Sequence, residues 1–402
     1  MLFEPNRHEP LLPTLWDPVA AKTCIQAIVA DLEETFRSES FWPPHPLDLD
    51  PGDPIISHKS VYFGAAGSLW ALWYLKQEQA VTLRLQPERL IESVEAAYHA
   101  TPDTGEAVPS YLLGRAGIQL IHWRLTGSPE VAARLHDSVT SNIDNPTNEM
   151  LWAAPGTMVA ALHMYRWTDE VRWRDLFLAN VEHVWRGWLP DETGDYRIWT
   201  QDLYGRIAQL IGTGHGFAGN VYPLLSGAAL LSAERCTALF DDCRQTVLAT
   251  AIVEGDSANW PPVAARTGAN TAMLMQWCHG APGMVTSLAP YPIDYSEALE
   301  AILLKAGEAI WDAGPLAKGP GLCHGTSGNG YAFLTLHRRT GDRVWLERAR
   351  LFAMHAIAQY ERMRHEYGRG RYSLWTGDPG LAVYLWHCLK GIGSLPGFDC
   401  LD

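Results

Sequence analysis

Cysteine and histidine stand next to each other at two points of this sequence, in the pairs Cys278-His279 and Cys323-His324. A third histidine, His215, precedes the same kind of glycine motif as these two pairs. Thiolate sulfur and imidazole nitrogen are preferred ligands of zinc, and imidazole is also the side chain best suited to exchange protons near neutral pH. These residues therefore indicate a metal centre with an acid–base group beside it.

The motif that places these residues has the form Gly-x-x-Gly and occurs in seven copies, one of which begins with alanine. Three consecutive copies are preceded by histidine, and in the last two of these the histidine follows cysteine. Equivalent positions in equivalent repeats are expected to face the same way. A closed array of repeats would therefore bring the cysteines and histidines to one centre. The seven copies are 64–67, 114–117, 153–156, 216–219, 280–283, 325–328 and 377–380.

Cys278, Cys323 and His324 offer two thiolates and one imidazole as metal ligands. Three protein ligands with one open position are typical of catalytic zinc sites, whereas structural sites usually take four ligands. The alternative is that two buried cysteines and a hydrogen-bonded histidine serve packing alone. Because the Cys-His pair recurs in register on adjacent repeats, we predict that these residues bind Zn²⁺.

Three further side chains are candidates for a role in the chemistry. His215 is the predicted general acid or base, because it faces the same centre one repeat earlier. His279 could line the site or hydrogen-bond around the metal, and the alternative is a polar packing role. Glu149, four residues before the third motif, could orient a histidine; the alternative is an ordinary acidic residue at a helix start.

Helices are predicted for most of the chain. At 131–139, 171–185 and 343–360, apolar residues recur about every 3.6 positions, and a helix-capping residue precedes each segment. This pattern predicts amphipathic helices. Segments after the motifs, such as 68–75 and 331–336, are apolar on all sides, as in buried helices. The alternation starts with 19–36 and repeats seven times. It predicts an all-α fold, an α/α toroid of seven inner and seven outer helices, forming a single domain over residues 1–402.

Small residues at the motifs would let inner helices approach a crowded axis, which is a structural explanation for the glycines alone. Long loops are expected at 41–59, 255–270 and 364–372, where they could form walls of the site.

The seven cysteines are an odd, sparse set in a chain of 402 residues, which argues against a disulfide framework.

The charge and composition of the sequence argue against several classes of function. The net charge is −14, and no basic run is present, so binding to nucleic acid or to an anionic membrane is not favoured. The start of the chain lacks the organisation of a signal peptide, and no apolar stretch reaches about 18 residues. We therefore expect a cytoplasmic protein without a membrane span.

At these motifs the sequence resembles the lanthionine synthetase C-like (LanC-like) family, which comprises the cyclases of lanthipeptide biosynthesis and their stand-alone relatives. The matching stretches are 214–220, 276–283 and 322–330. The resemblance implies a seven-fold α/α toroid with one zinc, bound by the residues that match Cys278, Cys323 and His324. It also implies an acid–base histidine at the position of His215.

The resemblance also concerns the thiol substrate. Peptide cyclases have an aspartate where this chain has Glu149. Some cyclases have a tyrosine at the position of His279, whereas glutathione-using relatives have a histidine there, as this chain does. Lys318 matches a lysine linked to glutathione binding in eukaryotic relatives. Arg7 is aligned with an N-terminal arginine of those relatives, although the residues around it match poorly.

Together these observations predict a zinc-dependent enzyme that forms thioethers. The thiol of glutathione or of a peptide cysteine would add to dehydroalanine or dehydrobutyrine in a peptide or protein, and His215 would protonate Cα. No dehydratase region precedes the toroid, so we expect a separate dehydratase to supply the substrate. The alternatives are a lanthipeptide cyclase proper and a non-catalytic adaptor that binds zinc and glutathione. Prenyltransferases and toroidal glycosidases are disfavoured, because their metal motifs and paired carboxylates are not evident here.

Overall fold

The computed structural model describes residues 1–52, 55–264 and 272–401. The chain forms two compact units, each made of several segments. Unit 1 comprises Met1–His8, Pro109–Tyr111 and His136–Gly314, and unit 2 comprises Glu9–Val108, Leu112–Leu135 and Pro315–Asp402.

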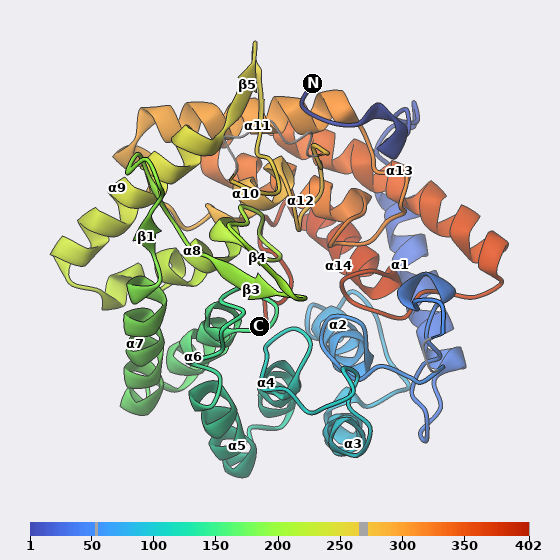
Figure 1. The fold of residues 1–402 in the computed structure, drawn as a ribbon. Coiled ribbons are helices and arrows are strands. Elements are labelled where there is room, and N and C mark those ends of the chain that lie inside the picture. Colours follow the sequence, from blue (N-terminus) through green and yellow to red (C-terminus); the bar gives the residue numbers. More distant parts are fainter. Residues whose placement is uncertain (53–54, 265–271, 402) are drawn as a thin grey trace. The chain divides into compact units, whose positions relative to one another are not determined.

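The described residues are mainly helical, and their few strands form three two-stranded antiparallel hairpins, β1–β2, β3–β4 and β5–β6 (Figure 1). The α-helices are α1 Pro18–Thr35, α2 Ala65–Gln77, α3 Pro87–Ala100, α4 Arg115–Thr126, α5 Pro129–Thr140, α6 Ala154–Thr168, α7 Val171–Arg186, α8 Phe217–Ser226, α9 Ala233–Thr250, α10 Ala281–Ser287, α11 Glu297–Ala313, α12 Thr326–Thr340, α13 Arg343–Tyr367 and α14 Asp378–Lys390. The strands are β1 Leu189–Pro190, β2 Arg197–Ile198, β3 Gln201–Leu203, β4 Arg206–Ala208, β5 Ile252–Glu254 and β6 Ser257–Asn259. Short 3-10 helices are η1 Pro5–Arg7, η2 Pro46–Asp48, η3 Ala228–Leu230 and η4 Ile293–Tyr295.

Each glycine motif begins a helix, as predicted. The first residue of every copy is the N-cap of an even-numbered helix from α2 to α14. These helices are buried over most of their length; in α12, for example, every residue from Thr326 to Leu336 is buried. A helix that is apolar and buried on all sides belongs to an interior layer.

The odd-numbered helices are amphipathic and cover the buried ones. In unit 2, α3 packs on α2 and α4, and α13 packs on α12 and α14; in unit 1, α7 packs on α6, and α11 packs on α10. On α7, Trp173 and Phe177 are buried while Arg172 and Asp175 are exposed. Because residues four positions apart lie on the same side of a helix, these apolar side chains share one face.

The second glycine of the motif has a steric cause. A Cβ atom on Gly67 would clash with the carbonyl oxygen of Val61, six residues earlier, and one on Gly283 would clash with the carbonyl oxygen of Trp277, again six residues earlier. The loop before each of these helices therefore folds back tightly onto the helix start, and only glycine leaves enough room. This supports the structural explanation for the glycines but does not account for the Cys-His pairs.

Equivalent positions of the repeats are connected by backbone hydrogen bonds. In unit 2, the amide of Cys323 donates to the carbonyl of Trp375 over 2.8 Å, the amide of Trp375 donates to Tyr62 over 3.2 Å, and that of Tyr62 donates to Leu112 over 3.0 Å. All four residues stand two positions before a motif. In unit 1 the corresponding bond joins the amide of Gly214 to the carbonyl of Cys278. Within each unit, equivalent positions therefore do lie side by side.

The predicted loops need correction at two places. Helix α13 does not end at Tyr360 but continues to Tyr367, so the first part of the predicted loop 364–372 is helical. Its cap is Gly368, whose φ of 64° is favourable for glycine. The predicted loop 255–270 contains strand β6, and residues 265–270 of it lie outside the described residues. The seven cysteines, all among the described residues, form no disulfide bond with one another, as expected.

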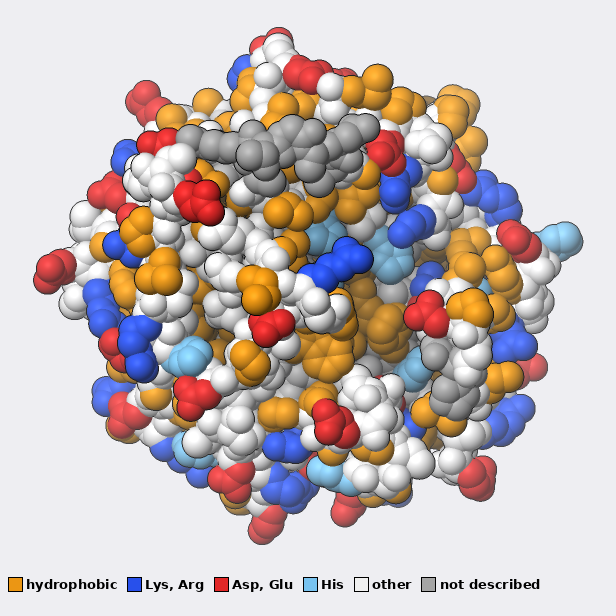
Figure 2. All heavy atoms as spheres, viewed as in Figure 1, with side chains coloured by type: hydrophobic (Ala, Val, Ile, Leu, Met, Phe, Trp, Pro, Cys, Tyr) orange, Lys and Arg blue, Asp and Glu red, His pale blue; other side chains and the backbone are white. Residues whose placement is uncertain are grey.

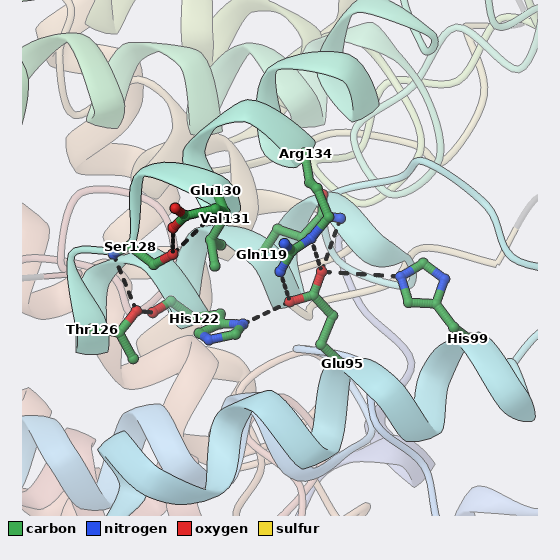
Figure 3. A network of polar contacts seen from close by, with 9 residues as sticks. All are labelled: Glu95, His99, Gln119, His122, Thr126, Ser128, Glu130, Val131 and Arg134. Atoms are coloured by element: carbon green, nitrogen blue, oxygen red, sulfur yellow. Dashed lines mark hydrogen bonds and ion pairs between the residues drawn. The ribbon is translucent and has the colours of Figure 1, made fainter.

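A buried carboxylate in unit 2 connects three consecutive helices (Figure 3). Glu95 on α3 accepts hydrogen bonds from Gln119 and His122 on α4, at 3.1 and 2.6 Å, and from the guanidinium of Arg134 on α5, at 2.9 and 3.0 Å. Burial alone would raise the pKa of Glu95, but these donors outweigh it and lower the pKa to about 2. The ionised carboxylate is thus the form that holds α3, α4 and α5 together.

Acidic and basic side chains are mixed over the face shown in Figure 2, in keeping with the absence of a basic run in the sequence. Among the described residues, no helix has both the length and the apolar character that a bilayer-spanning segment requires.

Candidate active site and metal ligands

A carboxylate–imidazole pair stands at the starts of two neighbouring inner helices of unit 1. Glu149 lies in the loop before α6, His215 lies directly before the N-cap of α8, and α6 packs against α8. The Nδ1 atom of His215 donates to Oε2 of Glu149 over 2.9 Å. Glu149 is 0% exposed and also accepts hydrogen bonds from the amides of Leu151 and Trp152. Glu149 thus accepts hydrogen bonds both from backbone amides of the loop before α6 and from the imidazole of His215.

The pair sets the protonation behaviour of His215. Burial alone would lower the pKa of His215, but the hydrogen bond and the charge of Glu149, together with the charge of Cys278, outweigh it and raise the pKa above its ordinary value. Because Nδ1 is engaged by Glu149, Nε2 is the nitrogen available to exchange a proton. The raised pKa favours the protonated imidazole, which is the form that a general acid needs.

His279 lies close to His215 but is held differently. The centroids of the two rings are 5.9 Å apart. The Nδ1 atom of His279 is buried and makes no hydrogen bond to a residue that the structure describes. Burial and, less strongly, the positive charge of His215 lower the pKa of His279, against an opposing effect of Cys278. The lowered pKa favours the neutral imidazole of His279, and no described residue orients it through a hydrogen bond to Nδ1.

Cys278 is the metal-ligand candidate of unit 1. It is buried, its carbonyl accepts a hydrogen bond from the amide of Gly214, and Nε2 of Gln276 donates to its sulfur over 3.0 Å. An amide that donates to sulfur favours the thiolate form, which is the form that binds metal. Glu149, His215, Cys278 and His279 are thus gathered in one unit.

Cys323 and His324 are the metal-ligand candidates of unit 2, directly before the N-cap of α12. Cys323 is buried, and its amide is tied to the carbonyl of Trp375. His324 is half-buried and lines a cavity of about 380 Å³. The thiol of Cys323 and the imidazole of His324 are both donors that suit zinc.

The cavity beside His324 is lined by several charged side chains. Arg362 pairs with Glu9 over 2.7 and 2.9 Å, and Arg371 pairs with Asp48 over 2.9 Å at its Nε atom. Lys318 is exposed, and no ion pair to another described residue engages its ammonium group. The charged lining residues are Glu9, Lys318, Arg362, Glu366 and Arg371. Lys318 is therefore a cation without an ionic partner in the described part of the chain, beside a predicted metal ligand.

Arg7 belongs to unit 1, whereas the residues that line this cavity belong to unit 2. It ends the short helix η1, and its guanidinium donates to the carboxylate of Glu4 over 2.5 Å. Arg7 is not linked to the carboxylate–imidazole pair by any hydrogen bond or ion pair among the described residues of unit 1.

Sequence reasoning missed Gln276, Trp152 and Tyr204. Gln276 stands two residues before Cys278, and Trp152 occupies the position of the histidines in the third repeat, so the repeat register could have indicated both. Tyr204 belongs to the β3–β4 hairpin, outside any motif, and its place beside His215 depends on the fold.

The family profile described as "Lanthionine synthetase C-like protein" matches residues 56–398. The chain belongs to the LanC-like family. LanC-like relatives include "Glutathione S-transferase LANCL1" of Danio rerio, 34% identical over 170 residues, and "LanC-like protein GCL1" of Arabidopsis thaliana, 39% identical over 137 residues. These matches cover 42% and 31% of this chain, and they span 39% and 30% of the relatives' own lengths.

Among solved structures, "Nisin cyclase" resembles this LanC-like protein with a TM-score of 0.64 and 16% sequence identity. The match covers 92% of this chain and 95% of nisin cyclase. A likeness at this level shows the fold, which is the α/α toroid predicted from the repeats.

Proposed function

We propose that this LanC-like protein is an enzyme that forms thioether bonds, adding a thiol to dehydroalanine or dehydrobutyrine in a peptide or protein. The observation that carries the proposal is the hydrogen bond between His215 and the buried Glu149, which prepares a proton donor beside Cys278. Family membership supports it, because relatives of the chain are named as a cyclase and as a glutathione transferase.

The proposed metal ligands are Cys278, Cys323 and His324, and the proposed metal is one Zn²⁺. The support is the chemistry of this donor set, the hydrogen bond from Gln276 to the sulfur of Cys278, and the shared register of the two cysteines in their repeats. A bound zinc would lower the pKa of a coordinated thiol, so that a thiolate nucleophile is present at neutral pH.

His215 then completes the addition. When a thiolate sulfur adds to Cβ of the dehydroamino residue, a carbon–sulfur bond forms and the alkene electron pair moves toward Cα and the carbonyl oxygen. The Nε2–H group of His215 protonates Cα, and Glu149 keeps the imidazole oriented through Nδ1. His279 lines the site in this proposal. The thiol and the alkene are already reactive, so that holding them together supplies much of the acceleration.

For the thiol, the cavity beside His324 favours a small anionic molecule such as glutathione. Lys318 is a cation without an ionic partner among the described residues, and it lines the same cavity as His324. It could therefore bind a carboxylate of the thiol at little cost. Arg7 is a second proposed contact for glutathione, supported only by the family resemblance. We further propose that a separate dehydratase supplies the dehydroamino acid.

The test is mass spectrometry of a dehydroalanine peptide without cysteine, incubated with the enzyme and glutathione. The proposal expects an enzyme-dependent mass increase equal to one glutathione, abolished by a metal chelator. Lys318→Ala should raise the KM for glutathione more than it lowers kcat, because it removes a binding contact away from the reacting atoms. Lys305→Ala, which removes a lysine from α11, is the matched control.

Two other outcomes would each establish a different function. If only peptides with their own cysteine react, losing a free thiol without a change in mass, the protein is a lanthipeptide cyclase. If zinc and glutathione bind but neither peptide reacts, the protein is a non-catalytic adaptor.

A further inference from the structure

Tyr204 lies at the tip of the β3–β4 hairpin of unit 1, between the paired residues Leu203 and Arg206, and its ring contacts the ring of His215. Figure 1 labels both strands of this hairpin. The two rings meet nearly edge to face, with centroids 6.1 Å apart. The Nε1 atom of Trp152 donates to Oη of Tyr204 over 3.0 Å. Because the phenol oxygen is the acceptor in this bond, its own proton remains available to another acceptor. None of the residues that the structure describes accepts it in a hydrogen bond.

Trp152, which donates to this hydroxyl, has a hydrogen-bond partner at each of its polar groups. The amide of Trp152 donates to Oε1 of Glu149 over 2.6 Å, and its carbonyl accepts from the side chains of Asn142 and Asn145 at 2.9 and 3.1 Å. Glu149 is the carboxylate that also orients the acid–base histidine. The tyrosine hydroxyl and the imidazole are therefore positioned by the same buried group.

The backbone of Tyr204 is unusual for such a bulky residue. Tyr204 and Gly205 have φ angles of 52° and 71°, and they join the paired residues Leu203 and Arg206, as in a type I′ turn. Asparagine and glycine are preferred at such positions, and bulky side chains rarely adopt them. Tyr204 is also 70% exposed, so core packing does not explain it. Unfavourable conformations of this kind cluster at functional sites.

We propose that Tyr204 is a catalytic residue whose hydroxyl donates a hydrogen bond to the carbonyl oxygen of the dehydroamino residue. The inference rests on the proposed function. When the thiolate sulfur bonds to Cβ, the alkene electron pair becomes an enolate with its negative charge largely on that oxygen. Tyr204 stabilises the charge without giving up its proton, and His215 then protonates Cα and restores the carbonyl. A donor aimed at developing negative charge is the arrangement that lowers barriers of this type.

The hydroxyl also keeps its proton at neutral pH. Although the side chain of Tyr204 is largely exposed, partial desolvation beside the neighbouring rings raises its pKa above the ordinary value; the hydrogen bond from Trp152 opposes this, and the charge of Glu149 adds to it. The two residues then have separate roles: His215 transfers a proton and Tyr204 donates a hydrogen bond.

The test compares two thiol-accepting alkenes, which differ in the atom that carries the negative charge after the thiolate has added. One is a dehydroalanine peptide, whose carbonyl oxygen takes the charge; the other is a vinylpyridine, which has no carbonyl. Tyr204→Phe should lower kcat/KM for the peptide by roughly tenfold to a hundredfold and leave that for the vinylpyridine unchanged. Tyr204→Asn, which suits the turn, should do the same if the hairpin folds. Tyr295→Phe, another partly exposed tyrosine of unit 1, should change neither value.

A double-mutant cycle separates Tyr204 from its partner. Trp152→Phe should slow the peptide reaction less than Tyr204→Phe does, and it should have no further effect in the Tyr204→Phe background. Equal losses on both acceptors, or no loss on either, would overturn the inference while leaving the proposed function intact.

A second readout does not depend on turnover. The affinity for the saturated alanine form of the same peptide, measured by calorimetry, should be several-fold weaker for Tyr204→Phe. If the wild-type protein adds no thiol to any acceptor but this affinity loss is found, the proposed function is wrong and Tyr204 is a carbonyl-binding residue only. Unchanged affinity together with inactive wild-type protein would overturn both.

Discussion

The Nδ1 atom of His215 lies 2.9 Å from Oε2 of the fully buried Glu149. The two residues are 66 positions apart in the sequence, and the stacking of α6 and α8 brings them together. The carboxylate raises the pKa of the histidine, although partial burial of the imidazole opposes this. A histidine adjusted in this way is suited to deliver a proton at neutral pH.

Replacing Glu149 by glutamine should move the pH dependence of the reaction. His215 acts as an acid in its protonated form, so the rate should fall as pH rises through its pKa. Glu149→Gln removes the charge and weakens the hydrogen bond that raise this pKa, so the fall should begin at a lower pH. The pH profile of kcat/KM measures this shift, with the exposed Asp256→Asn as control. An unchanged profile in a folded Glu149→Gln protein would show that Glu149 does not act through His215.

His215 should be separable from the metal. His215→Ala is expected to retain zinc and the fold but to lose turnover by about a hundredfold or more, since a positioned proton donor is removed. Turnover and metal content are measured on the same preparation, and His183→Ala, a partly exposed histidine of α7, serves as control. Loss of zinc from His215→Ala would mean that His215 is a ligand.

Glu95 should matter for stability. Glu95→Gln is expected to lower the free energy of unfolding by about 2 kcal/mol at neutral pH, because a buried carboxylate with three donor side chains loses its charge. Glu92→Gln, on the same helix but exposed, should have little effect. Chemical denaturation measures both.

The pH dependence of this effect has a definite sign. The folded pKa of Glu95, about 2, lies below the unfolded value of 4.5, so its contribution is complete above the unfolded value. The difference between wild type and Glu95→Gln should therefore shrink as pH falls from about 4.5 toward 2. A constant difference across this range would contradict the lowered pKa.

The helices and the register of the repeats could be predicted from sequence because their signals are local. Caps and apolar periods indicated the start of α7 at Val171 and the burial of α12, and the glycine motifs marked the helix starts. The end of α13 was predicted too early, since the charged residues after Tyr360 are compatible with helix and the first strong stop is Gly368.

Of the candidate site, only the residues that stand at motif positions could be predicted from the sequence. Cys278 and His215 stand at motif positions, and the motifs alone singled them out. Tyr204 reaches His215 from a hairpin of irregular sequence, a contact that depends on tertiary packing. That residues 1–402 form a single domain stays a prediction.

The metal content of the purified protein tests the proposed function most directly, because the proposed chemistry depends on one zinc bound by Cys278, Cys323 and His324. Elemental analysis should find one zinc per chain in the wild-type protein and in Cys236→Ala, whose cysteine lies on α9 outside the proposed site. Cys278→Ala and Cys323→Ala should each lose it. Carefully purified wild-type protein without bound metal, or full zinc occupancy in both cysteine variants, would show that the metal assignment is wrong.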